Sequence, residues 1–104
     1  MLPKAFVQQD DFDKAVKRVE KQLAGQVVRL RYSLDYDSTG DPAVFFRAVM
    51  PDEALGQEQL IDSIHKLWFE IEQKLKPRQR WGVYPYYRYR SQSSQERMEE
   101  PSWT

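Results

Sequence analysis

The sequence predicts an α+β domain, a two-layer sandwich in which two helices pack on one face of a three-stranded mixed sheet. Three observations support this prediction. In two segments, apolar residues recur at helical spacing on one side only. Two further segments are typical of strands, and an aromatic segment lies near the C-terminus. The expected order is helix, strand, strand, helix, strand. Because each helix is apolar on one side only, both can cover the same face of the sheet.

The composition limits the classes of protein to consider. The chain has 104 residues, of which 40% are hydrophobic, enough for one core. Its 16 basic and 16 acidic residues cancel, so no overall field attracts nucleic acid or lipid. The absence of cysteine excludes disulfides and thiolate ligands. The N-terminal residues do not resemble a signal peptide and no run is of membrane-spanning length, so we expect a cytoplasmic protein without membrane partners.

The first helix is expected over residues 11–24. Apolar residues from Phe12 to Leu23 recur at helical spacing, and the opposite side is rich in lysine and arginine. Asp10 or Asp11 is the expected N-cap, where a carboxylate suits the positive end of the helix dipole. Gly25 is expected to end the helix.

A hairpin should follow. Residues 27–37 alternate between apolar and polar side chains, which is typical of a half-buried strand. Asp37 and Gly40 belong to a turn cluster in which the aspartate caps the turn and the glycine supplies a positive φ. Residues 43–50 (AVFFRAVM) are largely apolar on both faces, which favours the central strand of the sheet.

The second helix is expected over 57–75, where a broad apolar stripe ends before Pro77. Residues 81–90 (WGVYPYYRYR) predict the third strand, parallel to the second because a helical crossover precedes it. Pro85 places this strand at an edge or at a bulge, which leaves the facing of later residues open. The domain should span 1–90, followed by a polar tail, 91–104, that is either flexible or docked by Trp103.

If both helices cover one face, the other face presents arginines and aromatic rings. The expected binding surface consists of Arg29, Arg31, Phe45, Arg47, Val49, Tyr84, Tyr86, Arg88 and Arg90. Such a surface suits a protein interface, with the chain itself or another protein, because these residue types are enriched there. It also suits RNA or single-stranded DNA, whose bases stack on rings and whose phosphates pair with guanidinium groups. A third alternative is coverage by the chain's own tail. Phe69, on the polar side of the second helix, is a secondary interface candidate.

Catalytic and metal chemistry have little support. His65 is the single histidine, at the margin of an apolar stripe, and no nucleophile elbow or glycine-rich phosphate loop occurs. Residues 35–41 resemble the start of a calcium loop, but Phe46 stands where the closing glutamate belongs. We therefore assign no catalytic residue, metal or cofactor. The remaining enzymatic alternative, a small hydrolase or transferase, would need His65 to meet Asp37 or Asp41 in a cleft.

The segments GDPAVFFR, PYYRYRSQSSQ and EEPSWT resemble a group of small bacterial proteins of unknown function. That group has a G-[DE]-P-A-x-F-F-R turn-strand and a P-Y-x-x-x-R-S-x-S segment, and the resemblance covers roughly residues 27–104. It implies a bacterial cytoplasmic domain and suggests an accessory or antitoxin-like partner of a neighbouring gene product. The element order is also similar to that of KH domains, but Gly56-Gln57-Glu58-Gln59 lacks the second glycine of their G-x-x-G loop. The sequence thus favours a non-enzymatic interaction module.

Overall fold

The computed structural model describes residues 2–52 and 60–104. Its elements are, in order, α1 (Lys4–Val7), α2 (Gln9–Gln22), β1 (Arg29–Tyr36), β2 (Pro42–Met50), α3 (Leu60–Leu75), α4 (Pro77–Trp81), β3 (Tyr84–Ser91), α5 (Gln92–Met98) and the 3₁₀ turn η2 (Pro101–Trp103). The longer elements follow the predicted order of helix, strand, strand, helix, strand. The α+β fold class is therefore confirmed. No helix in the described ranges is long and apolar enough to cross a membrane.

The three strands form one mixed sheet in the order β1-β2-β3. β1 and β2 are antiparallel, whereas β2 and β3 are parallel because α3 and α4 return the chain to the starting end of β2. The register between β2 and β3 is unbroken from Ala43↔Tyr84 to Met50↔Ser91. Pro85 therefore lies in an edge strand and causes no bulge, which settles the facing that the sequence left open.

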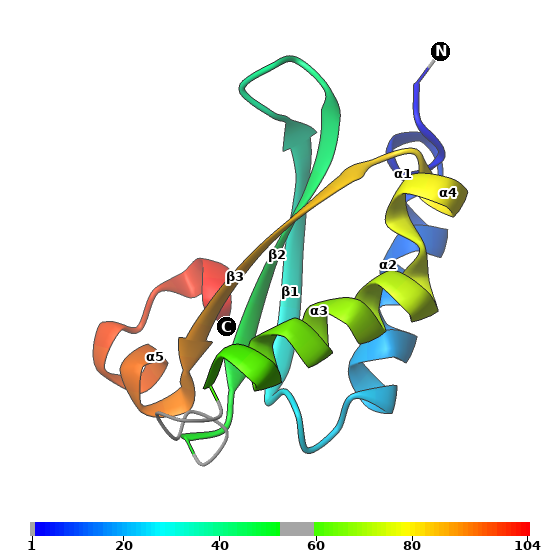
Figure 1. Cartoon of the computed structure of the whole chain (residues 1–104). Coiled ribbons are helices and arrows are strands. Elements are labelled where there is room, and N and C mark those ends of the chain that lie inside the picture. Colours follow the sequence, from blue (N-terminus) through cyan, green and yellow to red (C-terminus); the bar gives the residue numbers. More distant parts are fainter. Residues whose placement is uncertain (1, 53–59) are drawn as a thin grey trace.

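The two long helices cover the same face of the sheet (Figure 1). Phe12 and Val16 of α2 and Leu67 and Ile71 of α3 are buried against Phe46 at the centre of β2. This arrangement follows from the one-sided apolar stripes, since each helix can bury its stripe only against the sheet and its neighbouring helix. The core thus lies between the helices and one sheet face.

The structure corrects two local predictions. α2 begins at Gln9 rather than Asp11, because the chain is already helical in α1 and the Gln8 N–H donates to the Lys4 carbonyl at 2.8 Å. Asp10 and Asp11 consequently lie in the first turn rather than at the N-cap. The start predicted for the second helix, and the Gly56 loop, lie outside the described residues.

Trp81 is not part of the third strand. It ends α4, a short helix with Pro77 at its first position, and its indole packs edge-on against Phe12 with ring centroids 5.1 Å apart. Gly82 follows in the left-handed conformation, φ 68°, which allows the chain to leave the helix. The strand therefore begins only at Tyr84.

The polar tail is ordered against the sheet. α5 begins with a cap in which Ser91 Oγ accepts from the Ser94 N–H at 3.1 Å. η2 then returns along the sheet face opposite the long helices, where it contacts β1 and β2. Only 4% of the Trp103 side chain remains exposed. We call the sheet face opposite α2 and α3 the reverse face.

Candidate interaction surface

The reverse face is organised in rows of three residues across the strands. The register places Arg29, Val49 and Arg90 in one row, Arg31, Arg47 and Arg88 in the next, and Ser33, Phe45 and Tyr86 in a third. All nine residues predicted for the binding surface, Tyr84 included, therefore do share this face. The tail divides it into a tail-covered half (Arg29, Arg31, Arg47, Val49, Arg90) and an open half (Phe45, Tyr84, Tyr86, Arg88).

Three arginines of the tail-covered half hold the main chain of the tail. Their Nε atoms donate to the last three carbonyls of the chain: Arg47 to that of residue 102 at 2.7 Å, Arg29 to that of residue 103 at 3.3 Å, and Arg31 to that of residue 104 at 2.9 Å. Hydrogen bonds from a charged donor are stronger than neutral ones. The three guanidinium groups thus hold residues 102–104 of the same chain against the sheet.

The fourth arginine, Arg90, holds the side chains of the tail. Its guanidinium carbon lies 4.2 Å from the ring centroid of Trp103, a cation–π contact. The same group donates to Gln95 at 3.1 Å and to Glu100 at 3.4 Å. Gln95, the one buried polar residue of the described part, in turn donates to the Glu100 carbonyl at 2.9 Å. These contacts link α5, η2 and β3 into one unit.

Val49 is fully buried, with 0% of its surface exposed. The prediction that Val49 belongs to a free binding surface is therefore wrong: this part of the reverse face is occupied by the tail. For the same reason the four arginines of the tail-covered half, Arg29, Arg31, Arg47 and Arg90, serve the tail rather than an open surface. The sequence named tail coverage only as an alternative, because nothing local shows where Trp103 docks.

The open half is an aromatic patch. Phe45 stacks on Tyr86 with ring centroids 5.2 Å apart and planes at 13°, and Tyr84 lies 6.1 Å from Tyr86 at a tilt of 40°. The Arg78 guanidinium covers the ring of Tyr84 at 5.4 Å. Tyr84 and Tyr86 keep 51% and 41% of their surfaces exposed. The patch is therefore ordered by its own stacking and still open to solvent.

The hairpin turn fixes one side of the patch. The Oδ1 atom of Asp37 accepts from the Thr39 N–H and the Asp41 N–H, both at 2.9 Å, as the sequence predicts for a self-capped turn. Its Oδ2 atom accepts from the Tyr86 hydroxyl at 2.9 Å. Bonds from the Thr39 hydroxyl, the Asp41 N–H and Tyr86 lower the pKa of Asp37 to about 2. The same Asp37 contact raises the pKa of Tyr86.

Arg88 lies beside Arg47 in the central row. Burial and repulsion from Arg88 lower the pKa of Arg47. Arg47 has the Ser33 hydroxyl and the tail carbonyl as acceptors, whereas no hydrogen bond or ion pair joins Arg88 to another residue of the described ranges. Arg88 is thus the cation of the reverse face that can meet an aromatic or acidic group from outside.

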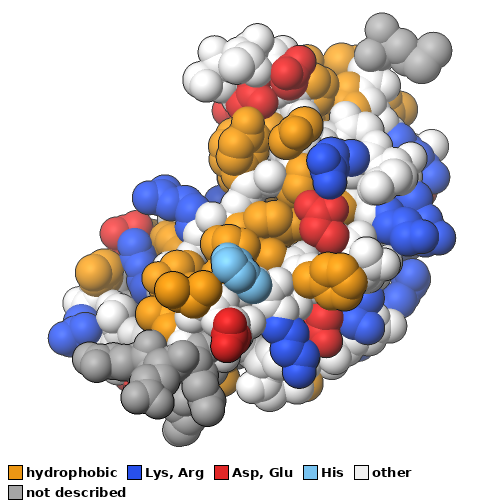
Figure 2. Space-filling view, viewed as in Figure 1, with side chains coloured by type: hydrophobic (Ala, Val, Ile, Leu, Met, Phe, Trp, Pro, Cys, Tyr) orange, Lys and Arg blue, Asp and Glu red, His pale blue; other side chains and the backbone are white. Residues whose placement is uncertain are grey.

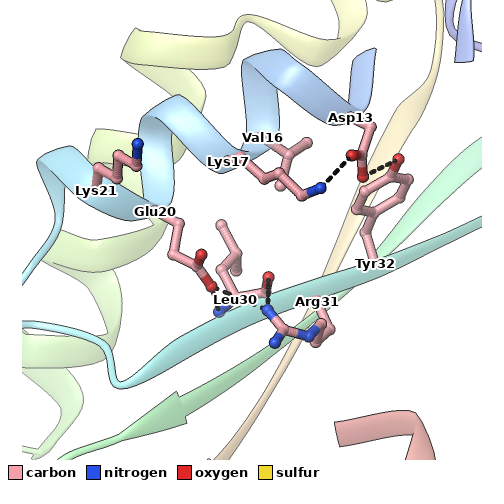
Figure 3. A pocket seen from close by; sticks show the side chains of 8 residues that line it. All are labelled: Asp13, Val16, Lys17, Glu20, Lys21, Leu30, Arg31 and Tyr32. Carbon is pink, nitrogen blue, oxygen red and sulfur yellow. Dashed lines mark hydrogen bonds and ion pairs between the residues drawn. The ribbon is translucent and has the colours of Figure 1, made fainter. Parts of the chain in front are cut away.

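A groove between α2 and β1 contains many of the other charges (Figure 3). In it, the Lys17 ammonium pairs with Asp13 at 2.8 Å, and the Tyr32 hydroxyl donates to Asp13 at 3.1 Å. Burial, followed by the bond to Asp13, raises the pKa of Tyr32 to about 12. Glu20 pairs with Arg31 at 3.1 Å. Four of the five charged side chains that line the groove therefore form ion pairs with one another, and the groove is not a site of one sign.

The residues that the enzymatic alternative requires to meet, His65 and either Asp37 or Asp41, lie far apart. His65 is exposed in the first half of α3, where its ring lies 6.0 Å from that of Trp68. Asp37 and Asp41 belong to the hairpin turn, which lies at the opposite end of the sheet from the start of α3 (Figure 1). These groups form no common cleft. Within the described ranges, no three His, Asp or Glu side chains gather in a way that could hold a metal ion.

Phe69, the secondary candidate, lies on the outer side of α3 with 62% of its surface exposed. It is on the helical layer and does not join the reverse face. It lines a shallow hollow with Glu72, Lys76 and Arg78. The structure therefore separates the predicted site residues into the tail-covered half, the open half and this isolated ring.

No protein-family model, curated protein or solved structure matches the chain.

Proposed function

We propose that the chain is a non-enzymatic protein-interaction module that binds its partner through the open half of the reverse face. The observation that carries this proposal is the stack of half-buried Phe45 with the exposed rings of Tyr86 and Tyr84, on a sheet face whose other half is already covered by the tail. Tyrosine and arginine are the side chains that most often contribute the binding energy of protein interfaces.

The stack is suited to this role because little ordering is needed on binding. Phe45 and Tyr86 already hold each other, and the Tyr86 hydroxyl is fixed by Asp37. A partner therefore gains contact with two rings at a low cost in side-chain entropy. The resemblance that the sequence motifs suggest would make the product of a neighbouring gene the partner; a second copy of this chain is the other candidate.

The arginines favour a protein partner over nucleic acid. Four of the five that a nucleic-acid site would use are engaged with the tail, and phosphates would have to replace those bonds. Arg88 alone remains without a bond in the described ranges. A balanced total charge adds no long-range attraction for a polyanion.

The test compares the wild type with a Phe45→Ser/Tyr86→Ser double variant. Each is co-expressed with the products of the adjacent genes and analysed by size-exclusion chromatography with light scattering. Val7→Ser, which removes an exposed apolar side chain from α1, is the matched control. We expect a complex for the wild type and for Val7→Ser, and its loss in the double variant.

A wild-type chain that stays monomeric and forms no complex would contradict the proposal, as would a complex that the double variant forms equally well. Fluorescence anisotropy with mixed RNA and DNA oligonucleotides at low salt completes the test. Tight, salt-dependent binding there, abolished by Arg88→Ala, would assign the surface to nucleic acid instead.

A further inference from the structure

The two edges of the sheet differ in how their main chain is satisfied. At the β1 edge, the Leu30 N–H donates to Glu20 at 2.6 Å and the Leu30 carbonyl accepts from Arg31 at 3.2 Å. Further along, the Tyr36 N–H donates to the Asp35 carboxylate at 2.7 Å. Side-chain caps at two points of an edge hinder another strand from pairing with it.

The β3 edge has no such protection. In a parallel ladder, one residue of each pair directs its N–H and carbonyl at the other strand. Pro85 has no N–H, so in its pair with Val44 it is Val44 that bonds across, to the main chain of Tyr84 and Tyr86. By alternation, the main chain of Pro85, Tyr87 and Tyr89 points away from the sheet. In the described ranges, no side chain bonds to the main chain of residues 84–90. β3 also runs across the front of the sheet with no other element drawn over it (Figure 1).

Apolar side chains accompany this open edge. Figure 2 shows hydrophobic side chains gathered along β3 and α3 on the side of the molecule that contains the edge. Ile61 and Phe69 of α3 and Tyr89 of β3 are among the exposed large hydrophobic residues. An open strand edge flanked by apolar groups is a template for a further strand.

We propose that β3 pairs antiparallel with β3 of a second copy, with Tyr87 opposite Tyr87, so that two three-stranded sheets join into one of six strands. This inference rests on the proposed function and names its partner, because Tyr84, Tyr86 and Arg88 of the open half belong to the same strand. The pairing is isologous, as in most closed dimers, and it hides the edge of each sheet that has no side-chain cap in the described ranges.

The side chains of β3 fit this register. On the reverse face, β3 is aromatic in its first half and cationic in its second half. With Tyr87 on the two-fold axis, Arg88 faces Tyr86 of the partner copy, so the cation that the tail leaves free meets a ring. A parallel arrangement, or a register centred on residue 88, would bring Arg88 against Arg88, where like charges repel.

The main chain fits as well. The N–H and carbonyl of Tyr87, which point away from β2, bond to the same groups of Tyr87 in the other copy across the two-fold axis. In the flanking pairs, the Tyr89 N–H of each copy donates to the Pro85 carbonyl of the other. Because Pro85 cannot donate in return, the Tyr89 N–H provides the only main-chain bond of that pair.

Replacement of Tyr89 by proline tests the edge directly. Tyr89→Pro removes an N–H that β2 does not use, so the fold should survive as it does with Pro85. Tyr89→Ala is the matched control, because it removes the same ring and keeps the N–H. In sedimentation equilibrium, Tyr89→Pro should weaken self-association relative to Tyr89→Ala by about tenfold or more, since two symmetric bonds are lost.

Circular dichroism checks that both variants are folded. Equal self-association of the two variants, or a monomeric wild type at high micromolar concentration, would overturn the proposal.

Cysteine cross-linking tests the register. The chain has no cysteine, so Tyr86→Cys and Arg88→Cys each carry one thiol. Residues 86 and 88 form a non-hydrogen-bonded pair in the proposed register, with Cα atoms about 4.5 Å apart, within disulfide range. Oxidation of an equimolar mixture should give mainly the mixed dimer. A predominance of the Tyr86→Cys or the Arg88→Cys homodimer would overturn this register.

The outcomes separate this inference from the proposed function. If Tyr89→Pro stays as associated as Tyr89→Ala while the Phe45→Ser/Tyr86→Ser variant loses a different protein, the edge pairing fails and the proposed function stands. If the wild type neither self-associates nor forms a complex, both fail.

Discussion

Replacement of Trp103 by alanine tests the docked tail, on which the division of the reverse face depends. A buried aromatic side chain removes about 150–250 Å² from water, which corresponds to about 4–6 kcal/mol at about 25 cal/mol per Å². Trp103 is 4% exposed and also makes the cation–π contact with Arg90. The tail can, however, detach while the rest of the domain stays folded, so the loss cannot exceed the free energy that docks it. We expect Trp103→Ala to lower the free energy of unfolding by about 3 kcal/mol, the lower end of the range for a buried aromatic residue replaced by alanine.

Urea denaturation followed by far-UV circular dichroism measures this loss. Hydrogen exchange on the native protein then shows where it occurs: the amides of residues 92–104 should lose nearly all their protection, while those of α2 and α3 should still exchange only through global unfolding and lose no more protection than the loss measured in urea. Met98→Ala is the control, because Met98 lies in the same tail with 56% of its surface exposed. It should change the free energy of unfolding by no more than about 0.5 kcal/mol.

The docking argument would be refuted if Trp103→Ala unfolded within about 0.5 kcal/mol of the wild type and left tail exchange unchanged. In that case Val49 would have to be covered by something other than the tail. If stability fell while the amides of residues 92–104 remained as protected as those of α2 and α3, the tail would unfold only together with the core.

Three further predictions concern single contacts. Glu20→Ala should destabilise the protein by about 1–3 kcal/mol in urea denaturation and increase light scattering on storage, because the Leu30 N–H at the β1 edge loses its acceptor. The lowered pKa of Asp37, about 2 against 3.8, means that its contribution to stability is fully present above about pH 5 and is lost as the pH falls through the folded value. An NMR titration of the Asp37 carboxyl group with a midpoint near 3.8 would contradict this. Tyr87→Phe removes the hydroxyl that donates to Glu72 at 3.0 Å and should cost about 1 kcal/mol in thermal or chemical unfolding, whereas unchanged stability would show that this bond contributes nothing.

Where the sequence predictions succeed, the signal is local. The alternation over residues 27–37 and the apolar character of 43–50 predict β1 and the central strand β2, and the apolar stripes predict α2 and most of α3. The self-capped turn at Asp37 follows from side-chain chemistry within five residues. These features depend on periodicity and short-range hydrogen bonds, which a single sequence displays directly.

Where they fail, a distant contact decides. Trp81 has the neighbours of a strand residue, yet it lies in α4 because its indole fits against Phe12, far away in the chain. α2 begins earlier than predicted because the residues before it are already helical in α1. In both cases, contacts or structure outside the local sequence pattern override the local preference.

By itself, the sequence determined which residues of β1 and β2 occupy the reverse face, since strand alternation assigns side chains to one face or the other. The unbroken register of β3 with β2 decided the facing of the residues after Pro85. Only the tertiary structure decided which of them remain open to a partner. Arg29 and Trp103 are 74 residues apart in the chain, and their contact depends on the sheet bringing four arginines into reach of a tail that has no periodicity of its own. The open aromatic half and the uncapped β3 edge are what this docking leaves accessible.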